Sequence, residues 1–140
     1  MKIIVIDGQG GGIGRQLVES IKKTIPNHEI IAIGTNALAT QAMLKAGADH
    51  AATGENAVIV ACRTADIITG PIGIVIADSL WGEITPSMAT AIGQSQATRI
   101  LLPMNQCNNY IVGIEDFSAS NLLQQTLDKI RKVCDNDRSC

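Results

Sequence analysis

Residues 2–14 of the chain read KIIVIDGQGGGIG, a short apolar run followed at once by a glycine-rich segment. The run at residues 2–6 has the composition of a strand that is buried on both faces. After the glycines, apolar residues recur at helical spacing from Ile13 to Ile25, and Pro26 ends that helix. The stretch therefore predicts a strand, a tight glycine loop and an amphipathic helix, in that order.

Strand-like and helix-like segments continue to alternate along the rest of the chain. We predict further strands at residues 29–33, 49–52, 66–69, 99–102 and 110–114, with helices between most of them and a last helix that runs to Cys134. Residues 74–80 fit either a helix or a strand. This alternation predicts an α/β fold, a three-layer, doubly wound and mainly parallel sheet of Rossmann-like type. In such a sheet the ligand crevice lies beyond the carboxyl ends of the strands, where the winding reverses.

The composition limits the number of domains and the kinds of partner that we expect. The 140 residues are 46% hydrophobic and 17% charged, which fits one domain at residues 1–134 with a polar C-terminal tail at residues 135–140. A formal net charge of −2 and an aromatic content of 2% argue against a nucleic-acid partner. The uncharged stretch at residues 67–77 is shorter than the roughly 20 residues of a membrane helix, so we expect no membrane partner.

The start of the chain and its cysteines point to a compartment. Residues 1–4 lack the basic region, apolar run and cleavage site of an export signal. The four cysteines form no Cys-x-x-Cys pair and neither histidine lies at zinc-finger spacing from one, so we expect no metal site. We expect a cytoplasmic protein with reduced thiols.

The glycine loop is the strongest functional signal. Glycine lets phosphate oxygens approach the backbone, and the N–H groups at a helix start attract anions. We therefore predict a phosphate or pyrophosphate site, and the alternative is that these glycines serve only the packing of the helix on the strand. It is not the loop of nucleoside triphosphatases, because Arg15 and Gln16 stand where that motif has Lys and Ser or Thr. The candidate residues are Gly8, Gln9, Gly10, Gly11, Gly12, Ile13 and Gly14.

Two resemblances rest on these motifs. The loop resembles the cofactor loop of Rossmann-type NAD(P)-binding proteins, including the Gly-x-x-x-Gly-Ile-Gly pattern of short-chain dehydrogenases. Over nearly the whole chain, the sequence is similar to a small bacterial family, a domain of unknown function. The second resemblance implies a bacterial Rossmann-like protein and assigns no catalytic residue. It is carried by residues 6–14, 34–36, 52–57, 70–73 and 82–86.

The end of the second predicted strand departs from the dinucleotide pattern. An Asp or Glu normally stands there to bind the ribose hydroxyls, whereas this chain has Gly34, Thr35 and Asn36. Thr35 and Asn36 can donate hydrogen bonds to ribose oxygens or to a 2′-phosphate, which favours NADP slightly over NAD as the cofactor. Another phosphorylated ligand stays open. The alternative is that Thr35 or Asn36 only caps the next helix.

The opposite wall of the crevice is expected to follow the fourth strand. Glycines there would let a ligand pass close to the chain, although Gly-Pro turns also occur where no ligand binds. The residues are Gly70, Pro71, Ile72 and Gly73.

Candidates for chemistry are few, and each has a structural alternative at a helix end, in the core or in solvent. Cys107 in its polar loop is a candidate nucleophile, Asp78 and Glu83 are a candidate acid–base pair, and Glu55 follows the third strand. The Tyr-x-x-x-Lys pair of short-chain dehydrogenases is missing, because Ile114 stands four residues after Tyr110.

Three functions remain open from the sequence. The first is a Rossmann-like nucleotide-binding protein of NAD(P) type, a sensor or regulatory module with a phosphorylated small molecule as its ligand. The second is a small NAD(P)-linked oxidoreductase. The third is a structural or interaction protein in which the glycine loop only packs. Trp81 is a candidate anchor for a subunit interface and favours a homodimer.

Overall fold

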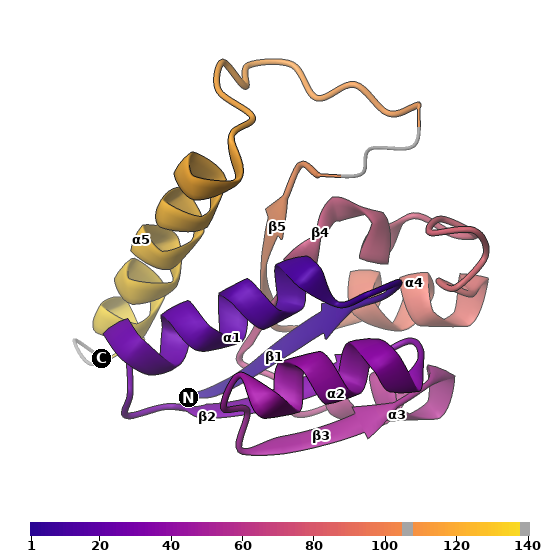
Figure 1. Cartoon of the computed structure of the whole chain (residues 1–140), viewed down its shortest axis with the longest axis horizontal. Coiled ribbons are helices and arrows are strands. Elements are labelled where there is room, and N and C mark those ends of the chain that lie inside the picture. The colour runs from indigo at the N-terminus through magenta and orange to yellow at the C-terminus, as the bar shows by residue number, and fades with distance from the viewer. Residues whose placement is uncertain (105–107, 138–140) are drawn as a thin grey trace.

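One parallel sheet organises the molecule. The computed structural model describes residues 1–104 and 108–137, and Figure 1 shows the chain with its elements labelled. The strands follow the spatial order β3-β2-β1-β4-β5, and every neighbouring pair is parallel. This arrangement confirms the predicted doubly wound, Rossmann-like α/β fold. Their bounds are β1 (Lys2–Asp7), β2 (Glu29–Gly34), β3 (His50–Thr53), β4 (Ile67–Pro71) and β5 (Thr98–Leu102).

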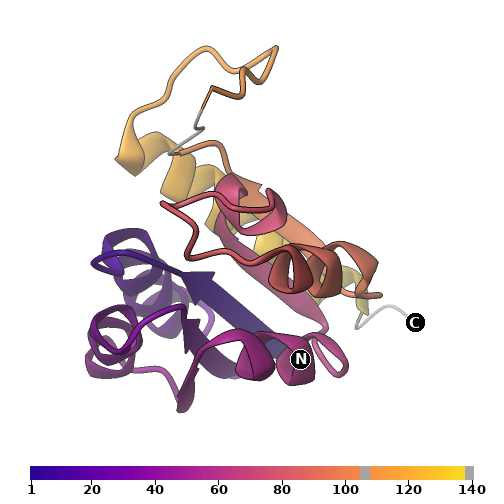
Figure 2. The ribbon, with the colours of Figure 1, turned by 90° about the vertical axis from the view of Figure 1, so that its right-hand side faces the viewer.

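Helices cover both faces of this sheet (Figure 2). One face carries α1 (Gly12–Thr24), α2 (Ala37–Lys45) and α5 (Ala119–Asp137). The other carries α3 (Glu55–Cys62), the short 3-10 helix η1 (Ile72–Val75) and α4 (Pro86–Gln94). Because side chains alternate along a strand, Ile3 and Val5 of β1 enter the first core, and Ile4 and Ile6 enter the second. Each central strand is thus buried on both faces, which explains its continuous apolar sequence.

Two helix starts carry side-chain caps. The Asn36 side chain accepts a hydrogen bond from the Ala39 N–H at 2.9 Å and caps α2. The Thr85 side chain accepts one from the Met88 N–H at 3.1 Å, and Pro86 occupies the first position of α4.

The predicted sixth strand at residues 110–114 is wrong. The described residues 108–118 contain no strand, and this connection projects away from the sheet before α5 begins (Figure 1). Tyr110 and Val112 are 91% and 98% exposed, and Gly113 turns the chain with a φ of 93°. An apolar pattern alone does not make a strand when the chain does not return to the sheet edge to pair.

Two other segments differ in detail. Residues 74–80 are neither a regular helix nor a strand, because η1 ends at Val75 and turns follow it. Helix α5 continues to Asp137, three residues past Cys134.

The winding of the sheet reverses between β1 and β4. Helix α1 connects β1 to β2 on one face, whereas α3 connects β3 to β4 on the other. The loop after β1 and the excursion after β4, residues 72–85, therefore leave the same edge of the sheet in different directions. The candidate site lies at this edge.

Candidate functional site

The glycine loop after β1 is a tight turn pressed against α2. The Gly11 N–H donates to the Gly8 carbonyl at 2.9 Å, and the backbone at Gly11 is left-handed with a φ of 71°. A Cβ at Gly11 would lie 2.8 Å from the Ala39 Cα, and a Cβ at Gly14 would lie 2.5 Å from the Met43 sulfur. These two glycines therefore allow close packing of helix on helix, as the packing alternative predicts.

Asp7, the last residue of β1, holds the loop from inside. Its side chain is buried and accepts hydrogen bonds from the N–H of Gly8 at 2.8 Å and of Gly14 at 2.7 Å. Burial raises the pKa of the Asp7 carboxyl above its ordinary value, although these backbone N–H groups act in the opposite sense. Sequence reasoning did not assign Asp7 a role. Its place between a buried strand and the first glycine is the signal that could have found it.

Gly10 and Gly12 differ from the packing glycines. A Cβ at either residue would meet no atom within 4 Å. In the described part of the chain, their N–H groups have no hydrogen-bond partner. Gly12 is the first residue of α1, where the helix dipole attracts negative charge. Close packing therefore does not account for these two glycines.

A carboxylate from a distant segment reaches this loop. The Oε1 atom of Glu83 accepts hydrogen bonds from Thr35 Oγ1 at 2.6 Å, Asn36 Nδ2 at 2.7 Å and the Gln9 N–H at 3.0 Å. Burial raises the pKa of Glu83, but these three donors outweigh it and hold that pKa below its ordinary value. The excursion after β4, the end of β2 and the glycine loop therefore meet at a single oxygen atom.

The backbone before Glu83 is strained. Asp78, Leu80 and Trp81 have φ angles of 64°, 54° and 57°, which are uncommon for residues with a side chain. The Ser79 hydroxyl donates to the Gly73 carbonyl, and the Asp78 N–H donates to the Ile84 carbonyl at 2.7 Å. Together these bonds close the excursion into a compact turn.

Asp78 and Glu83, the two carboxylates that the sequence suggested as a pair, have different surroundings. The Asp78 side chain is exposed, and no hydrogen bond joins it to Glu83 within the described residues. Trp81 is 97% exposed, so it stands clear of the core.

The expected opposite wall has mixed roles. A Cβ at Gly70 would lie 2.2 Å from the Ile6 carbonyl oxygen, so this glycine is required for the close approach of β4 to β1. Pro71 is buried, Ile72 is partly buried in η1, and the Gly73 carbonyl is bonded to Ser79. Residues 70–73 therefore lie next to the switch point, and their observed contacts are with other parts of the protein.

Glu55 and Arg15 are engaged in contacts away from the glycine loop. Glu55 accepts a hydrogen bond from Thr85 Oγ1 at 2.7 Å, which joins the starts of α3 and α4. Arg15 contacts Glu19 at 3.4 Å along α1. Cys107 lies outside the described residues.

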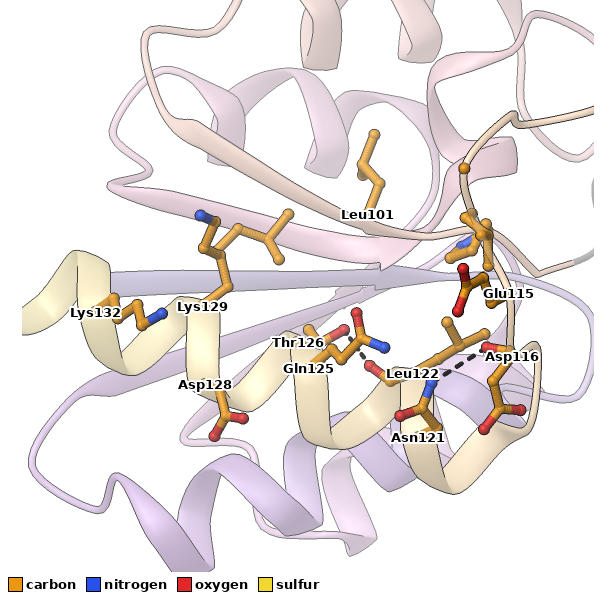
Figure 3. A pocket seen from close by; sticks show the side chains of 14 residues that line it. Leu101, Glu115, Asp116, Asn121, Leu122, Gln125, Thr126, Asp128, Lys129 and Lys132 are labelled. Atoms are coloured by element: carbon orange, nitrogen blue, oxygen red, sulfur yellow. Dashed lines mark hydrogen bonds between the residues drawn. The ribbon is translucent and has the colours of Figure 1, made fainter.

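A cavity of about 800 Å³ lies at a different place, between β5, α5 and residues 113–116 (Figure 3). Its wall mixes the acidic Glu115 and Asp116 with Lys129 and Lys132, and Asn121 donates to the Asp116 carbonyl at 3.2 Å. No residue of the glycine loop lines it. This cavity is therefore separate from the candidate site.

Residues 1–104 and 108–137 contain neither a candidate metal cluster nor a candidate membrane helix. No group of three or more His, Cys, Asp or Glu side chains there could hold a metal ion. No helix in that part is both long and apolar enough to cross a bilayer.

Comparison with known proteins identifies a family and a fold. A family model described as a domain of unknown function (DUF3842) matches residues 2–135. Among proteins of curated function, none matches the sequence. The crystal structure of a nucleoside-diphosphate-sugar epimerase from Pseudomonas aeruginosa matches with a TM-score of 0.50 and 17% identity, over 97% of this chain and 49% of that chain. The chain spans about half the length of that epimerase, and the likeness shows a shared Rossmann-like fold.

Proposed function

The chain belongs to the DUF3842 family, and we propose that it is a nucleotide-binding protein of NAD(P) type that acts as a sensor or regulatory module. The observation that carries the proposal is the pair of open glycines, Gly10 and Gly12, at the start of α1. Packing explains the close contacts of Gly11 and Gly14 but leaves these two without a role. A pyrophosphate bound over the loop would occupy this open space and accept hydrogen bonds from the N–H groups of Gly10 and Gly12.

The fold supports the same ligand class. In a doubly wound sheet, dinucleotides bind at the switch point with their pyrophosphate on the first helix. Here that point lies between β1 and β4, and the loop after β1 carries the open glycines. The matched epimerase is named for a nucleoside-diphosphate-sugar substrate, and we extend a nucleotide ligand from it to this chain as part of the proposal.

The test is calorimetric titration and thermal denaturation with NAD, NADP, their reduced forms, a sugar nucleotide and inorganic pyrophosphate. A ligand that binds only the folded state stabilises it by about 2.7 kcal/mol at a hundredfold excess over Kd. We expect at least one nucleotide to raise the melting temperature of the protein. A folded protein that none of these ligands stabilises would overturn the proposal.

Two glycine variants locate the site. Gly12→Val places a side chain in the open space over the loop, and we expect it to abolish nucleotide binding while the fold persists. Gly93→Val is the matched control, because Gly93 in α4 also has open space around its Cβ position but lies away from the loop. Equal loss of binding in both variants would contradict the assignment of the site to the loop.

A further inference from the structure

We propose that Glu83 is the carboxylate that binds the ribose hydroxyls of the nucleotide, so that the protein accepts a free 2′,3′-diol and rejects a ribose 2′-phosphate. The inference rests on the proposed function and deepens it, because it selects NAD-type over NADP-type ligands. It reverses the preference that the Thr35 and Asn36 side chains suggested from the sequence.

Position explains why a residue from another segment can take this role. In dinucleotide sites an acidic residue at the end of the second strand accepts hydrogen bonds from the ribose. Strand β2 ends at Gly34 without one, and the two residues after it, Thr35 and Asn36, both donate to Glu83. The chain therefore carries a carboxylate at the end of β2, supplied from the excursion after β4.

The two oxygens of Glu83 have different surroundings. Oε1 accepts the three hydrogen bonds from Thr35, Asn36 and the Gln9 N–H, which together with Glu83 form the Glu83 cluster. Oε2 has no hydrogen-bond partner within residues 1–104 and 108–137. The carboxylate is thus fixed through one oxygen and offers the other as an acceptor. A ribose diol supplies two hydroxyl donors for it, whereas a 2′-phosphate replaces one of these donors with negative charge at neutral pH.

The charge around the cluster favours the same choice. NADP sites use an Arg near the ribose to hold the 2′-phosphate. Among the described residues, no Lys or Arg takes part in the hydrogen bonds of Glu83, Thr35 or Asn36. Arg15 follows the loop but contacts Glu19. A 2′-phosphate would meet the Glu83 carboxylate without a compensating cation.

The competing interpretation is that the Glu83 carboxylate repels anions from the glycine loop and so weakens the binding of phosphate ligands there. Its Oε1 bonds the Gln9 N–H, and it would lie 3.2 Å from a Cβ at Gly8, so it stands next to the glycines. Under that interpretation, neutralising Glu83 would strengthen the binding of every phosphate ligand, including inorganic pyrophosphate, which has no ribose. Under the ribose assignment, pyrophosphate binding would not change.

The experiment titrates NAD, NADP and inorganic pyrophosphate into the wild-type protein and two variants by calorimetry. Glu83→Gln keeps the shape and one acceptor oxygen of the side chain but places an N–H₂ group where the second oxygen was. Glu29→Gln is the matched control, because Glu29 pairs with His50 at the opposite end of the sheet. Urea denaturation of each unliganded protein establishes that the variants are folded.

We expect wild type to bind NAD at least about tenfold more tightly than NADP, since one hydrogen bond to a charged group changes affinity by about tenfold or more. In Glu83→Gln, NAD binding should weaken about tenfold or more, NADP binding should hold or strengthen, and pyrophosphate binding should change by less than about twofold. Glu29→Gln should match wild type for all three ligands.

Each contrary outcome has a distinct meaning. NAD binding that exceeds NADP binding equally in wild type and Glu83→Gln overturns the role of Glu83 and leaves the proposed function intact. Stronger binding of pyrophosphate and both dinucleotides in Glu83→Gln also overturns it, in favour of anion repulsion. Failure of every ligand to bind any of the folded proteins overturns both proposals.

Discussion

Replacing Gly14 by alanine is the sharpest test of how the glycine loop is packed. Gly14 is the third residue of α1, and its added methyl carbon would lie 2.5 Å from the Met43 sulfur and 2.9 Å from the Asp7 Cβ. Met43 is fully buried, so its side chain can yield only by repacking against its neighbours in the core. The Asp7 Cβ is fixed by the strand, and the Asp7 carboxylate is bonded to the Gly14 N–H itself.

The expected magnitude is a balance of two effects. Alanine favours a helix over glycine by about 1 kcal/mol. Overpacking a closed core costs about 1 to 3 kcal/mol, and weakening the charged hydrogen bond from Gly14 to Asp7 costs about 1.5 to 3 kcal/mol more. The net loss in the free energy of unfolding should be about 1.5 to 5 kcal/mol, or roughly 6 to 20 °C in Tm.

The assay is urea denaturation followed by circular dichroism, with Gly93→Ala as the control. Gly93 also lies in a helix, but its added methyl meets no atom within 4 Å, so this variant should gain about 0.4 to 1 kcal/mol. Equal stability of the Gly14→Ala and Gly93→Ala proteins would refute the argument that Gly14 is a packing glycine.

Four further outcomes follow from the structure. Asp7→Asn should lower the free energy of unfolding by about 1 to 3 kcal/mol in urea denaturation, because its single amide oxygen can accept from only one of the Gly8 and Gly14 N–H groups and its NH2 group would face the other. The pKa of Glu83 is lowered from 4.5, so its stabilisation is complete above that pH and disappears as the pH falls through the folded value; the urea midpoints of wild type and Glu83→Gln should therefore differ at neutral pH and converge in acid. Burial raises the pKa of the Cys62 thiol to about 11, so mass spectrometry should find the Cys62 peptide unmodified after iodoacetamide treatment of the native protein at neutral pH, and modified in denaturant. Trp81→Phe should change the free energy of unfolding by less than about 0.5 kcal/mol, since this exposed side chain has no core contacts to lose.

The fold could be predicted because its signals are local. Each buried strand has a continuous apolar sequence, and each helix start at Asn36 and Thr85 carries its own cap. The glycine loop was also recognisable, because strand, glycines and helix are contiguous. The strand predicted at residues 110–114 failed for the complementary reason. Its apolar pattern is local, but pairing with the sheet depends on the path of the whole connection.

The different roles of the residues within the site could not be predicted from the sequence. Sequence spacing treats the glycines of the loop alike, whereas the neighbours of Gly14 and Gly12 assign them to packing and to open space. The contact between Glu83 and Thr35 joins residues 48 positions apart, through a turn with three left-handed residues that have side chains. No local pattern in the sequence encodes such a contact.

The separation of the paired strands along the chain also favours one order of strand pairing during folding. Strand β1 pairs with β2 across a separation of 27 residues and with β4 across 64, as the contacts of Met1 with His28 and of Lys2 with Asp66 show. Closing the longer loop costs about 0.8 kcal/mol more entropy, so the pairing of β1 with β2 is expected to precede that with β4. Glu83 follows β4, and it therefore reaches the glycine loop only after the second pairing. We therefore expect the hydrogen bonds at its Oε1 atom to report that β4 has joined the sheet, and an intermediate made of the first three strands would contain the loop without its carboxylate.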